Sequence, residues 1–294
     1  MYTLIINPES GQGAALANLP AVLAVLDERK LEYRLCKADS PEEATEYARR
    51  ACAEKSEGVI AIGGDGTLFQ VVNGMDSSEV PMIFIPCGTG NDFIKSLKLP
   101  VDPAEALRAQ LDAPLSQIDV GKMNDIRFLN VSGTGFDVDV LRYAEKYKQK
   151  HKGIKAYLFA LAEALKHYRP MTAMVSIDDG PEERVSFSII SIGNGRFFGG
   201  GMKAAPFADV TDGLFDVIMV KPVRKFMIPP LLAVYIPGKH IDVRMATLKR
   251  CKKLTIRCEG MTINLDGELR DADYARFELL SGALAVRIPN KKGS

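Results

Sequence analysis

One short segment, Gly63-Gly64-Asp65-Gly66-Thr67, constrains the possible folds of this chain more than any other. It follows an apolar run over residues 59–62 that is typical of a buried strand, and a helical pattern over residues 68–75 comes after it. Glycine-rich segments occupy the same strand-to-helix position at residues 7–13 and 86–92. This alternation predicts a parallel sheet with helices on its faces, a fold that binds ligands at the carboxyl edge of the sheet.

The rest of the first half fits that interpretation. Ser40 and Glu43 have the spacing of a capping box, and Pro41 occupies the first helical position, so a helix should begin there. The other expected elements are strands over residues 2–6, 32–36 and 82–85, and a helix over residues 14–29.

Strand-like segments dominate after about residue 115. They cover residues 116–120, 127–131, 171–177, 185–192, 214–220, 253–257, 261–265, 275–280 and 283–288, and helical patterns interrupt them at residues 138–165 and 225–235. A chain of 294 residues is long enough for two domains. We therefore predict an α/β domain with a parallel sheet over residues 1–118. A mostly antiparallel, β-rich sandwich should follow over residues 119–294, and its last strand could return to the first domain.

Charge and cysteine usage exclude several functional classes. The 38 Lys and Arg residues nearly balance the 37 Asp and Glu residues, so no bulk field attracts nucleic acid, and we expect no nucleic-acid partner. The five cysteines lack CxxC spacing, which argues against a disulfide framework or a zinc site and fits a cytoplasmic protein. The most apolar run, residues 227–237, is too short to span a membrane, and residues 14–26 lack the basic leader of a signal peptide.

The glycine-rich loops suit phosphate binding. Glycines let the backbone approach a phosphate closely, and a helix N-terminus offers free N–H groups. Asp65 would repel a phosphate directly, so it is better suited as an outer ligand of a phosphate-bound Mg²⁺. A tight glycine turn with Asp65 as a helix cap is the alternative. Three such loops on one edge favour a nucleotide-binding site over three unrelated turns.

These motifs together resemble the diacylglycerol kinase catalytic-domain superfamily, and the bacterial soluble lipid kinases are the nearest match. The resemblance covers nearly the whole chain, in order. The motifs that carry it are Asn7-Pro8-Glu9-Ser10-Gly11, Gly63-Gly64-Asp65-Gly66-Thr67, Gly88-Thr89-Gly90-Asn91-Asp92-Phe93, Gly133-Thr134-Gly135-Phe136-Asp137, the stretch from Asn194 to Val217, and Asp266-Gly267-Glu268.

The resemblance implies an ATP site in a cleft between the two domains. Asp65 and Asp92 would organise the Mg²⁺ of the nucleotide. Ser40 is the counterpart of a nucleotide-proximal threonine, although its expected role as a helix cap is an equally good interpretation. The residues implied to contact ATP are Asn7, Pro8, Ser10, Gly11, Ser40, Gly63, Gly64, Gly66, Thr67, Gln70, Gly88, Thr89, Asn91 and Asp92.

The resemblance also implies catalytic and structural carboxylates. Asp266 and Glu268 would supply the general base, because phosphoryl transfer needs a carboxylate to accept the proton of the substrate hydroxyl. On a strand the two side chains would share one face, whereas in a type I turn they would diverge, and a plain surface turn is a further alternative. A structural Mg²⁺ would bind Asp209, Asp212 and the region of Leu214, unless Asp212-Gly213 is a simple turn.

Two departures from the family pattern bear on the nucleotide site. Many relatives have Asn-Glu where this chain has Phe69-Gln70, which removes a carboxylate. Many relatives also carry a basic residue soon after the first loop, and none occurs here between Gly11 and Arg29. Arg196, Lys203 or Mg²⁺ would then have to balance the phosphate charge.

Two segments are candidates for membrane contact. Lysines at positions 146, 148, 150, 152 and 155 precede an apolar stretch, although a charged segment leading into a core helix is the favoured interpretation. Phe197 and Phe198 in a glycine-rich loop are better placed to admit an acyl chain.

We therefore expect an ATP- and Mg²⁺-dependent lipid kinase that phosphorylates a lipid hydroxyl, with diacylglycerol as the leading substrate. It should act in the cytoplasm, at the inner face of the membrane, and a homodimer is possible. The alternatives are an NAD kinase, which shares the Gly-Gly-Asp-Gly-Thr loop, and a catalytically silent nucleotide-binding regulator.

Overall fold

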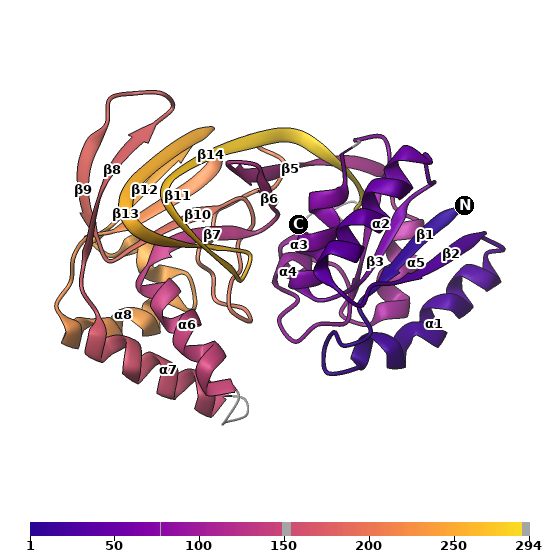
Figure 1. The fold of residues 1–294 in the computed structure, drawn as a ribbon, viewed down its shortest axis with the longest axis horizontal. Coiled ribbons are helices and arrows are strands. Elements are labelled where there is room, and N and C mark those ends of the chain that lie inside the picture. The colour runs from indigo at the N-terminus through magenta and orange to yellow at the C-terminus, as the bar shows by residue number, and fades with distance from the viewer. Residues whose placement is uncertain (77, 149–153, 290–294) are drawn as a thin grey trace.

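A computed structural model describes residues 1–76, 78–148 and 154–289 of the chain. Figure 1 shows the first half as alternating strands and helices at one end of the molecule. In chain order these are β1 (Tyr2–Ile6), α1 (Ala14–Glu28), β2 (Tyr33–Lys37), α2 (Pro41–Ala53), β3 (Val59–Gly63), α3 (Asp65–Gly74), β4 (Met82–Pro86), α4 (Asp92–Leu97) and α5 (Pro103–Leu111).

The first four strands form a parallel sheet in the order β2-β1-β3-β4. Every residue of β1, β3 and β4 is buried, because helices cover both faces of the sheet. The predicted start of α2 is confirmed: the hydroxyl of Ser40 accepts the N–H of Glu43 at 3.3 Å. Helix α3 begins at Asp65, earlier than the predicted residue 68, because the extended Gly64 is its N-cap.

The second half is built mainly from antiparallel strands. Its elements are β5 (Leu115–Met123), β6 (Ile126–Phe128), β7 (Val131–Gly135), α6 (Phe136–Lys148), α7 (Ile154–His167), β8 (Met171–Ile177), β9 (Glu183–Phe187), β10 (Ile189–Gly193), β11 (Phe215–Val220), η1 (Lys225–Met227), α8 (Ile228–Tyr235), η2 (Lys239–Asp242), β12 (Ala246–Cys251), β13 (Lys253–Leu265) and β14 (Glu268–Arg287). The predicted fold class, a parallel sheet followed by an antiparallel β-sandwich, is confirmed.

Several boundaries differ from the prediction. The helix expected over residues 138–165 consists of α6 and α7, and residues 149–153 lie outside the described part. The strand expected over residues 185–192 consists of two strands, β9 and β10, with Ser188 between them. The hydroxyl of Ser188 forms a hydrogen bond of 2.6 Å with the hydroxyl of Tyr168. Strand β12 was missed because its charged residues hide the strand pattern.

Strand β14 joins the two halves. It includes both of the last predicted strands, with a register shift near Gly282, and pairs with β13, β5 and β4. Strand β14 pairs with β4 in parallel through Val286 and Met82, so the end of this strand returns to the first sheet, as the yellow strand in Figure 1 shows. The predicted boundary after residue 118 falls inside β5. Among the described residues, no helix is both long and apolar enough to cross a membrane.

Candidate active site

The three glycine-rich loops meet at the carboxyl edge of the parallel sheet. The N–H of Gly64 donates to the hydroxyl of Ser10 at 2.9 Å, which links the first loop to the second. Gly64 and Gly88 lie so close together that neither position has room for a side chain. The backbone of Gly11 is similarly close to the carbonyl of Cys87. The sequence prediction that these loops share one edge therefore holds.

Asp65 links the second loop to helix α4. Its carboxylate accepts the N–H of Asp92 at 3.0 Å and the N–H of Phe93 at 3.1 Å. These N–H groups have no partner within the helix, so Asp65 caps α4 from another segment of the chain. Burial raises the pKa of Asp65, while the two N–H donors oppose that shift.

Asp92 links the first domain to the second. Its carboxylate accepts the N–H of Gly200 at 2.7 Å and pairs with the ammonium of Lys95 at 2.9 Å. The neighbouring Ser96 accepts the N–H of Arg196 at 3.1 Å. Helix α4 is therefore bonded at two points to the glycine-rich loop of the second domain.

Asp266 lies in the two-residue turn between β13 and β14. Both turn residues, Asp266 and Gly267, have positive φ angles of 51° and 104°, as in the primed turns that suit β-hairpins. The carboxylate of Asp266 accepts three backbone N–H groups, from Leu129 at 2.6 Å, Asn130 at 2.9 Å and Val131 at 3.0 Å. Burial, together with the nearby Asp65, nevertheless raises the pKa of Asp266 to about 7.

Glu268 differs from Asp266 in its surroundings. It begins β14 opposite Leu265, and its side chain is 39% exposed with Arg270 at 3.7 Å. The turn therefore separates the two carboxylates, as the divergent alternative predicted, although the turn is primed and not type I. Asp266 is fully occupied by backbone donors, and Glu268 is the carboxylate that remains accessible to solvent.

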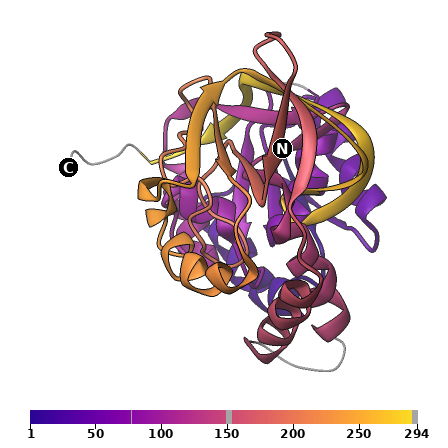
Figure 2. The same cartoon turned by 90° about the vertical axis from the view of Figure 1, so that its left-hand side faces the viewer.

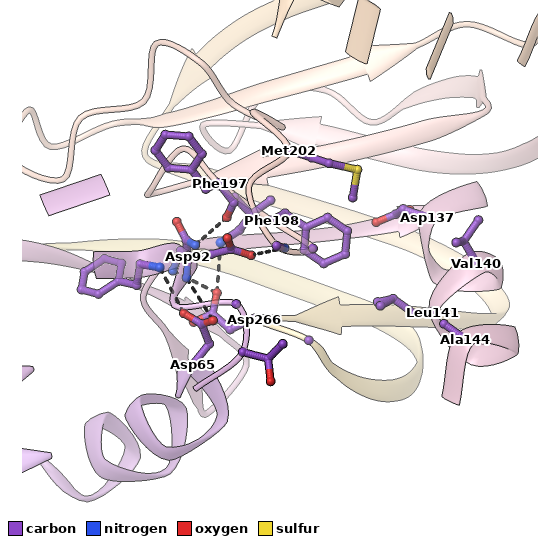
Figure 3. Close-up of a pocket in the computed structure, with 18 of the residues that line it drawn as sticks. Asp65, Asp92, Asp137, Val140, Leu141, Ala144, Phe197, Phe198, Met202 and Asp266 are labelled. Carbon is purple, nitrogen blue, oxygen red and sulfur yellow. Dashed lines mark hydrogen bonds between the residues drawn. The ribbon is translucent and has the colours of Figure 1, made fainter. Parts of the chain in front are cut away.

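A cavity of about 360 Å³ lies between the two domains. Asp65, Asp92 and Asp266 line one end of it, and in Figure 3 their carboxylates gather together. The opposite end is mainly apolar, although Figure 3 shows Asp137 there beside Val140. Its lining there includes Phe136, Val140, Leu141, Ala144, Ile189, Leu232 and Tyr235.

Two phenylalanines and a further carboxyl group complete the lining. Phe197 and Phe198 both line the cavity, and their contact with an acyl chain remains a prediction. Asp137, at the start of α6, also lines it. One oxygen of the Asp137 carboxyl group is buried without a hydrogen-bond partner, and burial raises the pKa of this group to about 7. In the sequence, Asp137 is part of the Gly133-Thr134-Gly135-Phe136-Asp137 motif, from which no role for this side chain was predicted.

Comparisons with known proteins agree with this geometry. Residues 1–123 match the model of the diacylglycerol kinase catalytic domain, and residues 130–288 match the YegS C-terminal NAD kinase beta sandwich-like domain. A Pseudomonas fluorescens protein named "Probable lipid kinase YegS-like" is 33% identical over 90% of this chain and 88% of its own length. The chain belongs to this lipid kinase family.

One further relative extends the match to nearly the full length, and two solved structures show the same fold. A diacylglycerol kinase of Mycobacterium tuberculosis is 28% identical over 98% of this chain and 94% of its own. A crystal structure of a diacylglycerol kinase from Bacillus anthracis covers 98% of this chain and 97% of its own with a TM-score of 0.75 and 24% identity. An ATP complex of an NAD kinase from Archaeoglobus fulgidus has a TM-score of 0.54 over 99% of this chain and 95% of its own, at 12% identity, which is a likeness of fold alone.

The family departure at Phe69 has a structural role in this chain. Phe69 lies on α3, yet it is buried in the core of the second domain beside Met123 and Phe128. One turn later on α3, Asn73 exchanges two hydrogen bonds with the backbone of Arg127 on β6, at 2.8 and 2.9 Å. Phe69, one of the two residues that replace the usual polar pair, thus helps to hold the domains together, as does Asn73.

Other predicted nucleotide residues have contacts of their own. Gln70 faces α2, where its backbone carbonyl accepts the hydroxyl of Thr45 at 3.0 Å. Ser40 caps α2, as one of its two interpretations required. Asn91 bonds the backbone of Gly88 in both directions at 2.9 Å and so shapes the third loop. Of the predicted nucleotide residues, Thr89 and Asp92 line the cavity itself. The contacts with ATP remain predictions.

The loop expected to hold a structural Mg²⁺ is already well bonded. Asp212 accepts the N–H of Leu214 at 3.0 Å and pairs with Arg250, which also bonds Asp216 at 2.9 Å. Asp209 accepts the N–H and hydroxyl of Thr211. Within the described ranges, no group of three His, Cys, Asp or Glu side chains is arranged to bind a metal, so this site remains a prediction.

Long-range contacts supply residues that the sequence analysis missed. Lys95 is a cation beside Asp92 and close to Gly201, and no motif singled it out. Asp119 is buried and accepts the N–H groups of Gly213 and Gly282, both at 2.8 Å. Of the lysines proposed for membrane contact, Lys150 and Lys152 lie outside the described residues.

Removing the Asp266 carboxylate should destabilise the protein. Asp266→Ala leaves three backbone N–H groups without their acceptor, and we expect a loss of at least about 2 kcal/mol in the free energy of unfolding. Glu268→Ala is the matched control and should stay within about 0.5 kcal/mol of the native protein. Urea denaturation of both variants measures the difference. Equal stability of the two would contradict the anchoring role of Asp266.

The raised pKa values of Asp137 and Asp266 predict a pH dependence of stability. In the unfolded chain an aspartate titrates near 3.9, about three units lower. Between about pH 4 and pH 7 the native state therefore holds protons that the unfolded state has released. The free energy of unfolding should fall as the pH rises through this window, by up to about 1.4 kcal/mol per pH unit for each group.

Asp137→Asn tests this pH dependence because it removes one of the two groups. The variant should have a shallower decrease in stability between pH 4 and pH 7, and Asp125→Asn on an exposed turn should keep the native slope. Urea denaturation across this pH range gives the measurement. An unchanged slope in Asp137→Asn would show that Asp137 titrates normally.

Proposed function

We propose that this protein is an ATP- and Mg²⁺-dependent lipid kinase that transfers the γ-phosphoryl group to the free hydroxyl of diacylglycerol. The observation that carries the proposal is a single interdomain cavity with carboxylates at one end and an apolar lining at the other. A diacylglycerol molecule has the same division, with one hydroxyl beside two hydrocarbon chains. The family to which the chain belongs contains proteins named diacylglycerol kinase.

The three loops would bind the phosphates of ATP. Their backbones lie together at the carboxyl ends of the strands, and the N-terminus of α3 lies among them. This arrangement favours an anion. Lys95, at 2.9 Å from Asp92, offers a cation near the same point and partly replaces the basic residue that is missing after the first loop.

Asp65 and Asp92 are suited to a nucleotide-bound Mg²⁺. Carboxylate oxygens are the ligands that this cation prefers, and both side chains line the cavity. When bound, Mg²⁺ would neutralise charge that develops on the phosphate oxygens. The N–H donors to Asp65 fix its orientation, so the chain presents this carboxylate in one position.

Glu268 is the best candidate for the general base. It directly follows Gly267, which lines the cavity, and its side chain is partly exposed. Asp266, by contrast, is held by three N–H groups and acts as a positioning residue for the turn. The lipid hydroxyl would lose its proton to Glu268 as its oxygen attacks the γ-phosphorus and ADP leaves.

The NAD kinase alternative fits the cavity less well. An NAD kinase must bind NAD⁺ beside ATP. The apolar end of the cavity, with residues of α6 and α8 such as Leu141 and Leu232, provides few polar partners for that second nucleotide. A silent regulator is disfavoured because Asp65, Asp92, Asp266 and Glu268 are all present, although the carboxylate usual at position 70 is not. A cytoplasmic enzyme working at the inner membrane surface belongs to the same proposal.

A substrate panel tests the proposed function. The purified protein with Mg²⁺ and labelled ATP should transfer label to diacylglycerol in mixed micelles and leave NAD⁺ unchanged. Formation of NADP⁺ without labelled lipid would support the NAD kinase alternative and reject ours. Binding of ATP without label in diacylglycerol, monoacylglycerol, a sphingoid base, phosphatidylglycerol or a polyprenol would also reject it.

Replacing Glu268 should slow the chemical step without unfolding the protein. Glu268→Gln keeps the shape of the side chain but removes the proton acceptor, so we expect kcat to fall by about 10²- to 10⁴-fold with little change in the KM for ATP. Glu259→Gln, on an exposed part of β13, is the control. If kcat stays at the native level in Glu268→Gln, another group takes the proton.

A further inference from the structure

The segment from Lys221 to Met245 has an unusual surface. Phe226 is 71% exposed and Ile236 is 49% exposed, although both are large apolar side chains. The segment carries five cations and only one acid, Asp242. The cations are Lys221, Arg224, Lys225, Lys239 and Arg244. Because the whole chain has a net charge of only +1, this excess of positive charge is local.

Packing holds this segment in place. Ile228, Leu231 and Leu232 pack with residues of α6 and α7 in one apolar cluster. The ammonium of Lys225 donates to the carbonyl of Lys166 at 2.6 Å, which fastens η1 to the end of α7. Phe226 is therefore presented by a packed element and is not part of a loose loop.

Helix α7, which packs against this segment, also carries exposed apolar and basic side chains. Leu158 is 56% exposed, and Lys155 is exposed one turn earlier on the helix. Figures 1 and 2 both show α7 and α8 side by side at one end of the second domain. Exposed apolar groups and cations thus occur on two helices that pack against each other.

Helix α8 also lines the cavity. Leu232 and Tyr235 of α8 line the apolar end of the cavity, and Ile236 follows Tyr235 directly. Helix α8 therefore has one side in the apolar end of the cavity and another side exposed at the surface. A surface bound here would lie next to the apolar lining.

We propose that the α8 docking surface, defined by Arg224, Phe226, Ile236 and Lys239, binds the surface of an anionic lipid bilayer. Two interactions hold such a surface to a membrane. An apolar or aromatic side chain inserts among the lipid headgroups, and cations beside it are attracted to anionic lipids. A second copy of this chain fits the surface poorly, because a two-fold contact would set its cations against themselves. This inference rests on the proposed function, because docking at this surface would bring the cavity next to its lipid substrate.

The test is co-sedimentation of the full-length protein with vesicles, which requires no turnover. We expect binding to vesicles of phosphatidylglycerol and phosphatidylcholine in equal parts, and much weaker binding to pure phosphatidylcholine. Arg224→Gln with Lys239→Gln should lower the partition coefficient about 30-fold, because two surface cations are lost. Phe226→Ser should lower it by about tenfold or more, and binding should weaken with salt.

Matched controls are available elsewhere on the second domain. Tyr274→Ser removes an exposed aromatic ring from β14, and Arg184→Gln removes an exposed cation from β9; both should bind vesicles like the native protein. Equal binding to both kinds of vesicle would overturn the proposal. So would native binding by the Phe226 variant, or a dimer in sedimentation equilibrium that Phe226→Ser dissociates.

A second measurement separates this proposal from the proposed function. With a short-chain, water-soluble diacylglycerol, the docking variants should keep native turnover, while on long-chain lipid in anionic vesicles they should be slower. A native protein that binds anionic vesicles through this surface but phosphorylates no lipid would reject the proposed function and leave the docking surface supported. Loss of turnover on the short-chain lipid would show that these side chains belong to the cavity and would overturn the docking role.

Discussion

The hydrogen bonds to the Asp266 carboxylate fix the turn on which the candidate site depends. Three successive N–H groups of residues 129–131 point to one side chain, so the entry into β7 and the hairpin of β13 and β14 are locked together. Glu268 begins the strand immediately after that turn. The backbone position of Glu268 is therefore fixed by the neighbouring Asp266, which is the support that the proposed general base would need.

Carboxylates play the same part in the first domain. Asp65 holds the start of α4, and Asp92 holds the loop at Gly200 on the other side of the cleft. One chain of hydrogen bonds thus runs from the second glycine-rich loop, through α4, into the second domain. Together with Phe69 and Asn73 on α3, these bonds connect the two domains on either side of the cleft.

Local signals in the sequence predicted the parts of the structure that local chemistry decides. The cap at Ser40, the glycine-rich strand exits and the Asp-Gly turn all rely on residues within a few positions of each other. The different environments of Asp266 and Glu268 could not be predicted, because the donors to Asp266 come from residues more than 130 positions away. The length of β14 was missed for a similar reason, since its pairing with β13, β5 and β4 is what makes it continuous across Gly282.

The grouping of acidic side chains explains why this cleft suits a cation better than a bare phosphate. Burial raises the pKa of both Asp65 and Asp266, and each carboxylate makes ionisation of the nearby groups harder. Phe69 stands where a polar residue is common in the family, and it stabilises the domain contact instead of adding another charge. Lys95 is paired with Asp92, so part of its charge is already balanced. In the proposed function, a divalent cation that binds with the nucleotide would reduce the repulsion between these carboxylates and the phosphates.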